Sequence, residues 1–165
     1  MDNQHVSKTY GEDEIVKYAN PDNWELWDSP TGYETLYQTF PEFTCLCPRS
    51  SYPDFARVHL VVVPSTKVLE LKNLKMWLNS YRNKKISHEN ATFEILDTLV
   101  KKLDLAYGFI LMEYTPRGNL TTFPMREFSN INYVAKSVDS ELSVKNAIEI
   151  KNKIINHVMQ RQLDR

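Results

Sequence analysis

The spacing of apolar residues changes along this chain, and this change most constrains the fold. Residues 57–63 place apolar side chains at every second position, Val58, Leu60 and Val62, which is typical of a strand with a buried face. A Pro-Ser-Thr turn follows, and we expect residues 67–71 to return as the second strand of an antiparallel hairpin. From about residue 72 to 83 the apolar residues recur at helical spacing instead. The chain must therefore pack helices against a sheet.

The other elements follow from the same patterns. Aromatic residues beside a turn predict a first strand over Tyr33–Thr39. Ser87 is a suitable N-cap for a second helix over residues 88–103. Strand patterns return at 107–114 and near 120–128. The order strand, strand, helix, helix, strand, strand predicts an α+β fold with a four-stranded antiparallel sheet.

We divide the chain into three parts. Residues 1–20 are polar and mixed in charge, and we expect a loosely held arm there. Residues 21–130 form one α+β domain, and residues 131–165 form an extension. An apolar stripe predicts an appended helix over residues 141–162, which either packs on the surface of an oligomer or lengthens an interface.

Composition narrows the function classes. The 165 residues include 20 basic and 21 acidic side chains, so a net charge of -1 gives no electrostatic case for binding nucleic acid. No apolar run approaches the roughly 20 residues that span a bilayer, and we see no secretory leader. The two cysteines are Cys45 and Cys47, too close in sequence for an easy disulfide. We therefore expect a cytoplasmic protein with reduced thiols and no membrane segment.

The proline-bounded segment 41–56 is the first candidate for chemistry. It places Cys47 seven residues before Asp54, and its prolines favour a rigid loop. Cys47 is either a small buried hydrophobe or a nucleophile, and Asp54 is either a turn residue or a proton donor. Cys45 shares the ambiguity of Cys47. Together with His88, the two cysteines offer side chains of the types that bind zinc. A C-x-C pair is a weak zinc signature, so we expect no metal.

Polar residues at the starts of the two predicted helices are the second candidate. His88 and Glu89 fall in the first turn of the second helix, where the helix dipole favours a carboxylate. They are either surface residues or part of a pocket. Lys72 and Lys75 lie on one face of the first helix, where they are either solvated charges or contacts for an anionic ligand.

The order and spacing of four sequence blocks resemble the nitrile reductases of queuosine biosynthesis, the QueF or 7-cyano-7-deazaguanine reductase family. The resemblance runs from about Tyr10 to Phe128. Its blocks are EFTCLCPRSSYPDFA at 42–56, ELKNLKMW at 70–77, HEN at 88–90 and PRGN at 116–119.

The resemblance implies a specific reaction and assigns its residues. Cys47 matches the nucleophile that attacks the nitrile carbon of 7-cyano-7-deazaguanine to form a covalent thioimidate. Asp54 matches the residue that donates protons to the nitrogen, and two reductions by NADPH complete the amine. Glu89 matches the residue that accepts hydrogen bonds from the guanine-like edge of the ring. His88 matches a residue that lies close to the reacting group.

The block at residues 70–77 matches the motif that the family links to NADPH. By that pattern Lys72, Lys75 and Arg117 meet the phosphates of the cofactor, and we assign Glu70 to the substrate pocket. Four positions depart from the usual family pattern. They are Asn73, Met76, Ala91 and Asn119.

The fold implied is the tunnelling fold, with two helices on one face of the sheet. Family members with one such module assemble as homo-oligomeric rings, typically two stacked pentamers, with active sites between subunits. The resemblance leaves two alternatives to the reductase. One is the amidine-forming cousin that acts on tRNA, against which the block at 70–77 argues. The other is a purine-binding protein of the same fold without catalytic activity.

Overall fold

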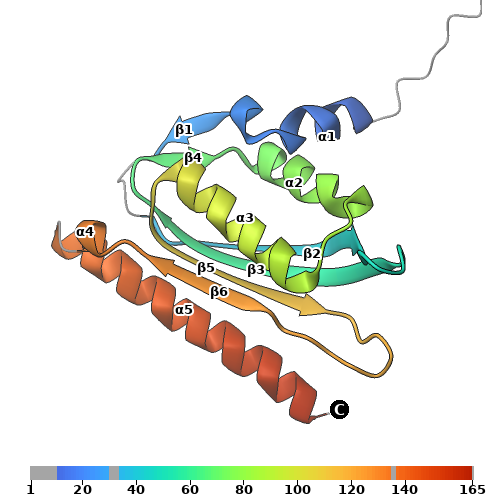
Figure 1. Ribbon diagram of the computed structural model, residues 1–165. Coiled ribbons are helices and arrows are strands. Elements are labelled where there is room, and N and C mark those ends of the chain that lie inside the picture. Colours follow the sequence, from blue (N-terminus) through green and yellow to red (C-terminus); the bar gives the residue numbers. More distant parts are fainter. Residues whose placement is uncertain (1–10, 30–33, 135–136, 165) are drawn as a thin grey trace, which may run out of the picture.

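A four-stranded antiparallel sheet forms the centre of the molecule (Figure 1). The computed structural model describes residues 11–29, 34–134 and 137–164. The sheet has the strand order β2-β3-β5-β6, so β3 and β5 are its central strands. The bounds of its strands are β2 Leu36–Leu46, β3 Pro53–Pro64, β5 Leu105–Tyr114 and β6 Met125–Ser129. The predicted antiparallel sheet of four strands is therefore confirmed.

Two helices, α2 (Leu71–Asn79) and α3 (His88–Leu103), cover one face of this sheet (Figure 1). A short 3-10 helix, η2 (Ser80–Asn83), continues α2 and completes the first predicted helix. The bounds of α3 agree with the prediction, and the Ser87 side chain accepts a hydrogen bond from the Asn90 amide at 3.2 Å. The alternating residues of β3 that were predicted to share a face pack with both helices in one core; they are Val58, Leu60 and Val62.

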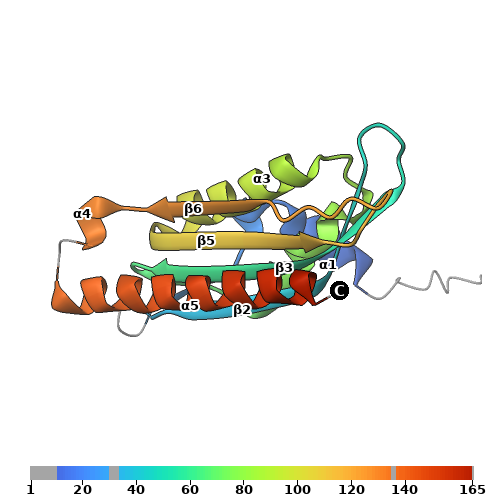
Figure 2. The ribbon, with the colours of Figure 1, turned by 90° about the horizontal axis from the view of Figure 1, so that it is seen from below.

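The C-terminal helix α5 (Val138–Leu163) lies across the other face of the sheet, against β3 and β5 (Figure 2). A short helix, α4 (Ile131–Val134), precedes it. Val61 and Val63 of β3 enter a second core with the apolar stripe of α5. The appended helix was predicted, but its place against its own sheet was not. Among the described residues, no helix has both the length and the apolar character needed to cross a membrane.

The predicted hairpin after β3 is wrong. Strand β4 (Lys67–Leu69) pairs with β1 (Leu26–Asp28) in a separate two-stranded sheet. The reason is that β3 already pairs with β2 along one edge and with β5 along the other, so neither edge is free for β4. The hairpin partner of β3 is β2, and the loop between these two strands carries Cys47.

Two boundaries differ from the prediction. Strand β2 begins at Leu36 and continues past the predicted end to Leu46, with an irregular register between Phe40 and Phe43 where Pro41 interrupts the pairing. Tyr33 lies outside the described residues. Strand β6 begins at Met125, later than predicted, because the chain before it forms a loop beside the candidate site.

Part of the predicted N-terminal arm is helical. Helix α1 (Glu12–Ala19) contacts α2, and Tyr18 packs against the main core. A 3-10 turn, η1 (Pro21–Asn23), then leads to Trp24, whose indole N–H donates to the Tyr18 carbonyl at 3.0 Å. The arm is therefore attached to the domain from Glu12 onward.

Replacing Val158 by alanine tests the docking of α5. Val158 is fully buried in the second core, so Val158→Ala should lower the free energy of unfolding by about 2 kcal/mol in a denaturant titration. The control Ile148→Ala removes apolar volume from a more exposed position of the same helix, 36% exposed, and should change it by less than about 0.5 kcal/mol. Equal effects of the two substitutions would contradict this placement of α5.

Candidate active site

Three segments distant in sequence converge at one end of the sheet (Figure 1). They are the loop 47–52 between β2 and β3, the start of α3, and the loop 115–124 after β5. The backbone of Leu46 accounts for part of this convergence. Its N–H donates to the Lys84 carbonyl at 2.9 Å, and its carbonyl accepts from the Ile86 N–H at 3.0 Å. These bonds bring the first residue of α3, His88, beside the Cys47 loop.

The loop 47–52 is shaped to stabilise a thiolate. The Cys47 N–H donates to the Tyr52 carbonyl at 2.8 Å, and the Ser51 N–H donates to the Cys47 carbonyl at 2.9 Å, which closes a tight turn. Hydrogen bonds from the Ser50 hydroxyl, and then from the Ser50 and Arg49 backbone amides, lower the pKa of Cys47 to about 7. The thiol is partly exposed, so it is both ionisable and accessible.

A single guanidinium connects the acid to this loop. The Asp54 side chain is 6% exposed, and its Oδ1 accepts from Arg117 Nη1 at 2.7 Å. Arg117 Nη2 donates to Ser50 Oγ at 2.6 Å. Because that bond occupies Ser50 as an acceptor, the hydroxyl proton of Ser50 is available to the sulfur of Cys47. A buried carboxylate needs such a partner, since removing it leaves an uncompensated charge.

The imidazole of His88 completes the cluster. Its Nε2 lies 3.5 Å from Asp54 Oδ2, and its Nδ1 lies 2.8 Å from Thr122 Oγ1. The ring stacks on the buried Tyr114 with centroids 3.6 Å apart and an interplanar angle of 9°. Glu89, the next residue of α3, is exposed, and its charge is one of the causes that raise the pKa of Tyr114, after burial. The structure thus brings together Cys47, Asp54, His88 and Arg117, which come from three of the four sequence blocks.

The two cysteines have opposite environments. Cys45 is 0% exposed, and its sulfur lies 3.9 Å from the Ile86 carbonyl and 4.0 Å from the Tyr114 hydroxyl. Burial raises the pKa of Cys45 to about 11, so it remains a neutral thiol. Its environment is that of a core residue, which resolves the ambiguity between the two. In the part of the chain that the structure describes, no three His, Cys, Asp or Glu side chains form a metal cluster.

A cavity of about 380 Å³ opens beside Asp54. This volume falls within the range of roughly 300–1,000 Å³ for small-molecule pockets. Two of its aromatic side chains, Tyr52 and Phe55, are more than half exposed, and they offer flat surfaces for a heterocycle. The lining residues are Tyr52, Pro53, Asp54, Phe55, Thr115, Pro116 and Arg117.

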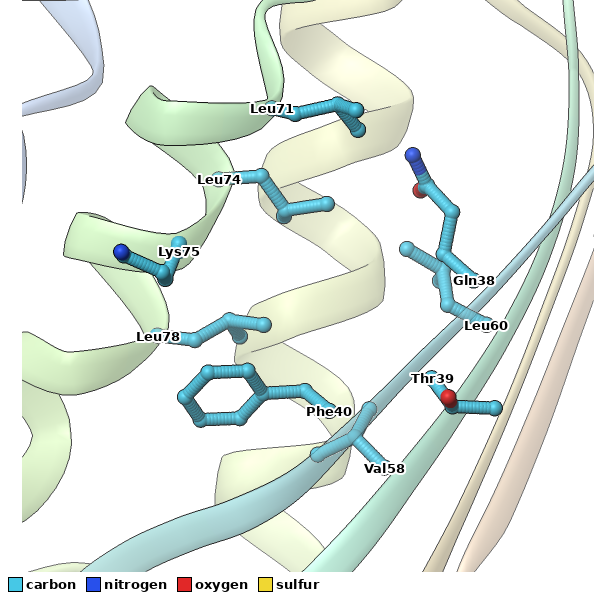
Figure 3. A pocket seen from close by; sticks show the side chains of 9 residues that line it. All are labelled: Gln38, Thr39, Phe40, Val58, Leu60, Leu71, Leu74, Lys75 and Leu78. Atoms are coloured by element: carbon cyan, nitrogen blue, oxygen red, sulfur yellow. The ribbon is translucent and has the colours of Figure 1, made fainter.

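The candidate residues of α2 lie around a different pocket. Lys75 is among the residues that line a mostly apolar pocket of about 310 Å³ between α2 and strands β2 and β3, and Figure 3 shows its amine directed away from the other labelled side chains. The Nζ of Lys72 forms an ion pair with Glu14 of α1. Arg117, predicted to act beside these lysines, instead contacts Asp54, and the two pockets share no lining residue. The structure of one chain therefore does not bring the three cationic residues together.

Glu70 has a structural partner in the same chain. Its carboxylate caps α2 by accepting from the Lys72 N–H at 2.9 Å and the Asn73 N–H at 2.8 Å. Asn73 is buried, and its side-chain oxygen accepts from the Glu25 N–H at 2.8 Å. The departure at Asn73 from the family pattern is therefore explained by a bond that joins α2 to the segment before β1.

Sequence reasoning missed three residues that contact the candidate catalytic groups: Ser50, Tyr114 and Thr122. Ser50 lies inside the CPRSSYP block, so its position two residues before Tyr52 in a turn was a usable signal. Tyr114 and Thr122 reach His88 only through the pairing of β5 with the chain before β6, and no local pattern indicates that contact.

The pH dependence of alkylation tests the environment of Cys47. A thiolate exists only above its pKa, so the rate of modification by iodoacetamide should rise with pH and reach half its maximum near pH 7. Ser50→Ala removes the largest stabilising contact and should move this midpoint upward, toward the ordinary value of about 8.5. Ser51→Gly is the matched control, because it keeps the positive φ of 58° and should leave the midpoint unchanged. A midpoint above pH 8 in the unmodified protein would contradict this environment.

Comparisons with known proteins agree with these observations. Residues 53–133 match the model of a family described as QueF-like protein. The NADPH-dependent 7-cyano-7-deazaguanine reductase of a Nitratiruptor species is 47% identical over 116 residues, which cover 68% of this chain and 87% of the relative. The reductase of the same name from Aquifex aeolicus is 46% identical over 129 residues, covering 76% and 95%.

A solved structure shows the same fold. The crystal structure of the archaeosine synthase QueF-Like in the apo form has a TM-score of 0.55 and 19% identity, and covers 62% of this chain and 98% of that one. This likeness confirms the expected tunnelling fold. On the sequence identities above, the chain belongs to the QueF family, whose members include the NADPH-dependent 7-cyano-7-deazaguanine reductases.

Proposed function

We propose that this protein is an NADPH-dependent reductase that converts 7-cyano-7-deazaguanine to 7-aminomethyl-7-deazaguanine, a step of queuosine biosynthesis. One observation supports the proposal above all: a partly exposed thiol with a lowered pKa lies in the same bonded cluster as a buried carboxylate. The names of the similar reductases give the substrate and the cofactor.

Cys47 is the nucleophile in this proposal. Its thiolate attacks the nitrile carbon, the S–C bond forms, and one C≡N π bond becomes the new N–H bond of a thioimidate. Asp54 delivers that proton to the nitrogen, where negative charge develops during the attack. The proton is the one that the thiol gives up, so the step is balanced without any other reactant. Arg117 keeps the two groups together, because it binds Asp54 and, through Ser50, the Cys47 loop.

Glu89 and His88 give the site its substrate specificity and its proton supply. The Glu89 carboxylate at the start of α3 accepts from the ring N–H and the exocyclic amine of a guanine-like edge. His88 lies against Asp54 and returns protons to it. Within its own chain the carboxylate of Glu70 caps α2, so we propose that Glu70 contacts substrate only across a subunit boundary.

The pocket beside α2 suits part of the cofactor. Its apolar wall suits a planar ring, and the cationic Lys75 of α2 beside it suits a phosphate, so the residues fit part of a dinucleotide. Lys72 adds a second cation, although it is engaged by Glu14, and Arg117 is the third candidate contact. NADPH, when bound, supplies the hydride for each of the two reductions. The separation of this pocket from the Cys47 cluster favours a complete site made by two subunits.

We propose that the protein acts as a homo-oligomeric ring, and two stacked pentamers are the arrangement typical of single-module members of the family. The outer edges of the sheet are β2 and β6, and pairing of these edges between subunits would satisfy their exposed backbone groups. The substrate is a small molecule, with no direct contact to nucleic acid. Two free cysteines fit a reducing compartment, so we propose the cytoplasm as the site of action.

Cofactor consumption tests the proposed reaction. The purified protein, given the nitrile and NADPH, should oxidise about two equivalents of NADPH per nitrile, which is followed by the absorbance of the cofactor. Cys47→Ala should abolish this activity because no thioimidate can form. The matched control is Cys45→Ala, two residues away, which changes a core thiol and should retain most of it. No NADPH oxidation by folded protein, with or without added ammonia, would contradict a reductase, and amidine formation would favour the tRNA-linked cousin.

A further inference from the structure

The imidazole of His88 is held by a threonine to which neither the family pattern nor the proposed function assigns a role. Thr122 Oγ1 lies 2.8 Å from Nδ1, on the opposite side of the ring from the Asp54 carboxylate. We propose that Thr122 is a positioning residue whose hydroxyl fixes the imidazole proton on Nε2 and relays protons from solvent through His88 to Asp54. This inference rests on the proposed function, because it needs a reaction that consumes protons at Asp54.

The pairing of backbone segments places Thr122 at the ring. The Tyr114 N–H donates to the Thr122 carbonyl at 3.2 Å, and the Met112 N–H donates to the Pro124 carbonyl at 3.0 Å. These bonds continue the pairing of β5 with the residues that come just before β6. The same register therefore puts the Tyr114 ring on the face of the imidazole and the Thr122 hydroxyl at its edge. Thr122 is half-buried, so it lies between the buried site and solvent.

The charges around the ring select one tautomer. Asp54 Oδ1 accepts from Arg117 Nη1 at 2.7 Å, and a carboxylate that pairs with a guanidinium is an acceptor only. The nitrogen that faces it, Nε2, must then carry the proton, because a lone pair there would oppose the negative charge. Nδ1 is left as an acceptor, and the Thr122 hydroxyl is the donor beside it. Tyr114, on which the ring stacks, is buried, and burial raises its pKa, so it stays neutral beside the ring.

The separation of 3.5 Å between Nε2 and Asp54 Oδ2 is longer than an established hydrogen bond. Catalytic contacts in free enzymes are often long and shorten only with substrate bound. The stacking on Tyr114 and the bond to Thr122 restrict the ring to a plane in which Nε2 keeps facing Asp54. Thr122 therefore fixes the direction in which the proton can move.

The relay balances as a chain of single proton transfers. Asp54 gives its proton to the substrate nitrogen and takes the Nε2 proton of His88. Nδ1 takes the proton of the Thr122 hydroxyl, and that hydroxyl takes a proton from water. One O–H or N–H bond breaks for each one that forms, so the net change moves one proton from solvent to the substrate. A hydroxyl suits this position because it donates to Nδ1 in one state and accepts from it in the other.

The first test is the tautomer of His88 in the resting protein. Long-range proton–nitrogen NMR spectra, with the His88 signals identified by their loss in His88→Gln, should show the proton on Nε2. Thr122→Val, which removes the hydroxyl at nearly constant shape, should give a mixture of tautomers. Thr122→Ser should restore the Nε2 form, and Thr121→Val, the neighbouring threonine, should leave it unchanged.

The second test is kinetic. Thr122→Val should lower kcat for NADPH oxidation about tenfold and leave the KM for the nitrile within about twofold. The expected loss of kcat is smaller than the roughly 100-fold or more that general acid–base catalysis contributes, because Thr122 acts only through His88. Thr122→Ser should recover most of it. If Thr122→Val does not fold, Thr122→Ala replaces it in both tests.

A proton on Nδ1 of His88 in the unmodified protein overturns the inference. So does a variant without the hydroxyl whose tautomer ratio and kcat equal those of the unmodified protein. Failure of the proposed reaction is distinguishable from failure of the relay: if no variant oxidises NADPH, the NMR result still decides the tautomer, and it requires no activity.

Discussion

The structure depends on the pairing of β3 with β5, because this pair is buried on both faces. The alternating residues of β3 divide between two cores, with Val58 and Leu60 toward α2 and α3 and with Val61 and Val63 toward α5. Neither core could form if the register slipped by one residue, since every side chain would then change face. Close packing adds to this constraint: at Gly108 of β5, any side chain would meet Leu96 of α3 at 2.8 Å.

The candidate active site lies at one end of this strand pair, and the register of the pair determines which side chains meet there. Ala56 of β3 is opposite Tyr114 of β5, and the two strands are antiparallel. Asp54, just before Ala56, and Arg117, just after Tyr114, therefore lie at the same end of the sheet. The ion pair between them couples the acid to the thiolate loop. Electrostatics and topology therefore act together, because the buried charge of Asp54 is tolerated only where the register supplies its partner.

Much of the fold could be predicted because its patterns are local. The Ser87 cap and the helical spacing after it predicted the bounds of α3, and the alternation in β3 predicted the face that packs against α2 and α3. The pairing of β4 could not be predicted, because it depends on which strand edges are already occupied. The place of α5 on its own sheet had the same difficulty, since an apolar stripe shows that a helix is buried and not what covers it.

The candidate site, like the fold, could be predicted only in part from the sequence. Cys47, Asp54 and His88 carried a signal through the order of the sequence blocks, while Cys45 could be separated from Cys47 only by its burial. The structure shows Arg117 bound to Asp54, whereas the family pattern predicts that it meets a phosphate. Arginine in a short loop serves either role, and only the fold decides which anion it meets.

The central claim is that one thiol of two is the nucleophile, and a covalent adduct tests it most directly. The protein is incubated with 7-cyano-7-deazaguanine without NADPH, digested, and its peptides are examined by mass spectrometry at the residue level. The account predicts an added mass equal to the whole nitrile on Cys47 and none on Cys45. No adduct on folded protein, or an adduct on Cys45, would contradict it.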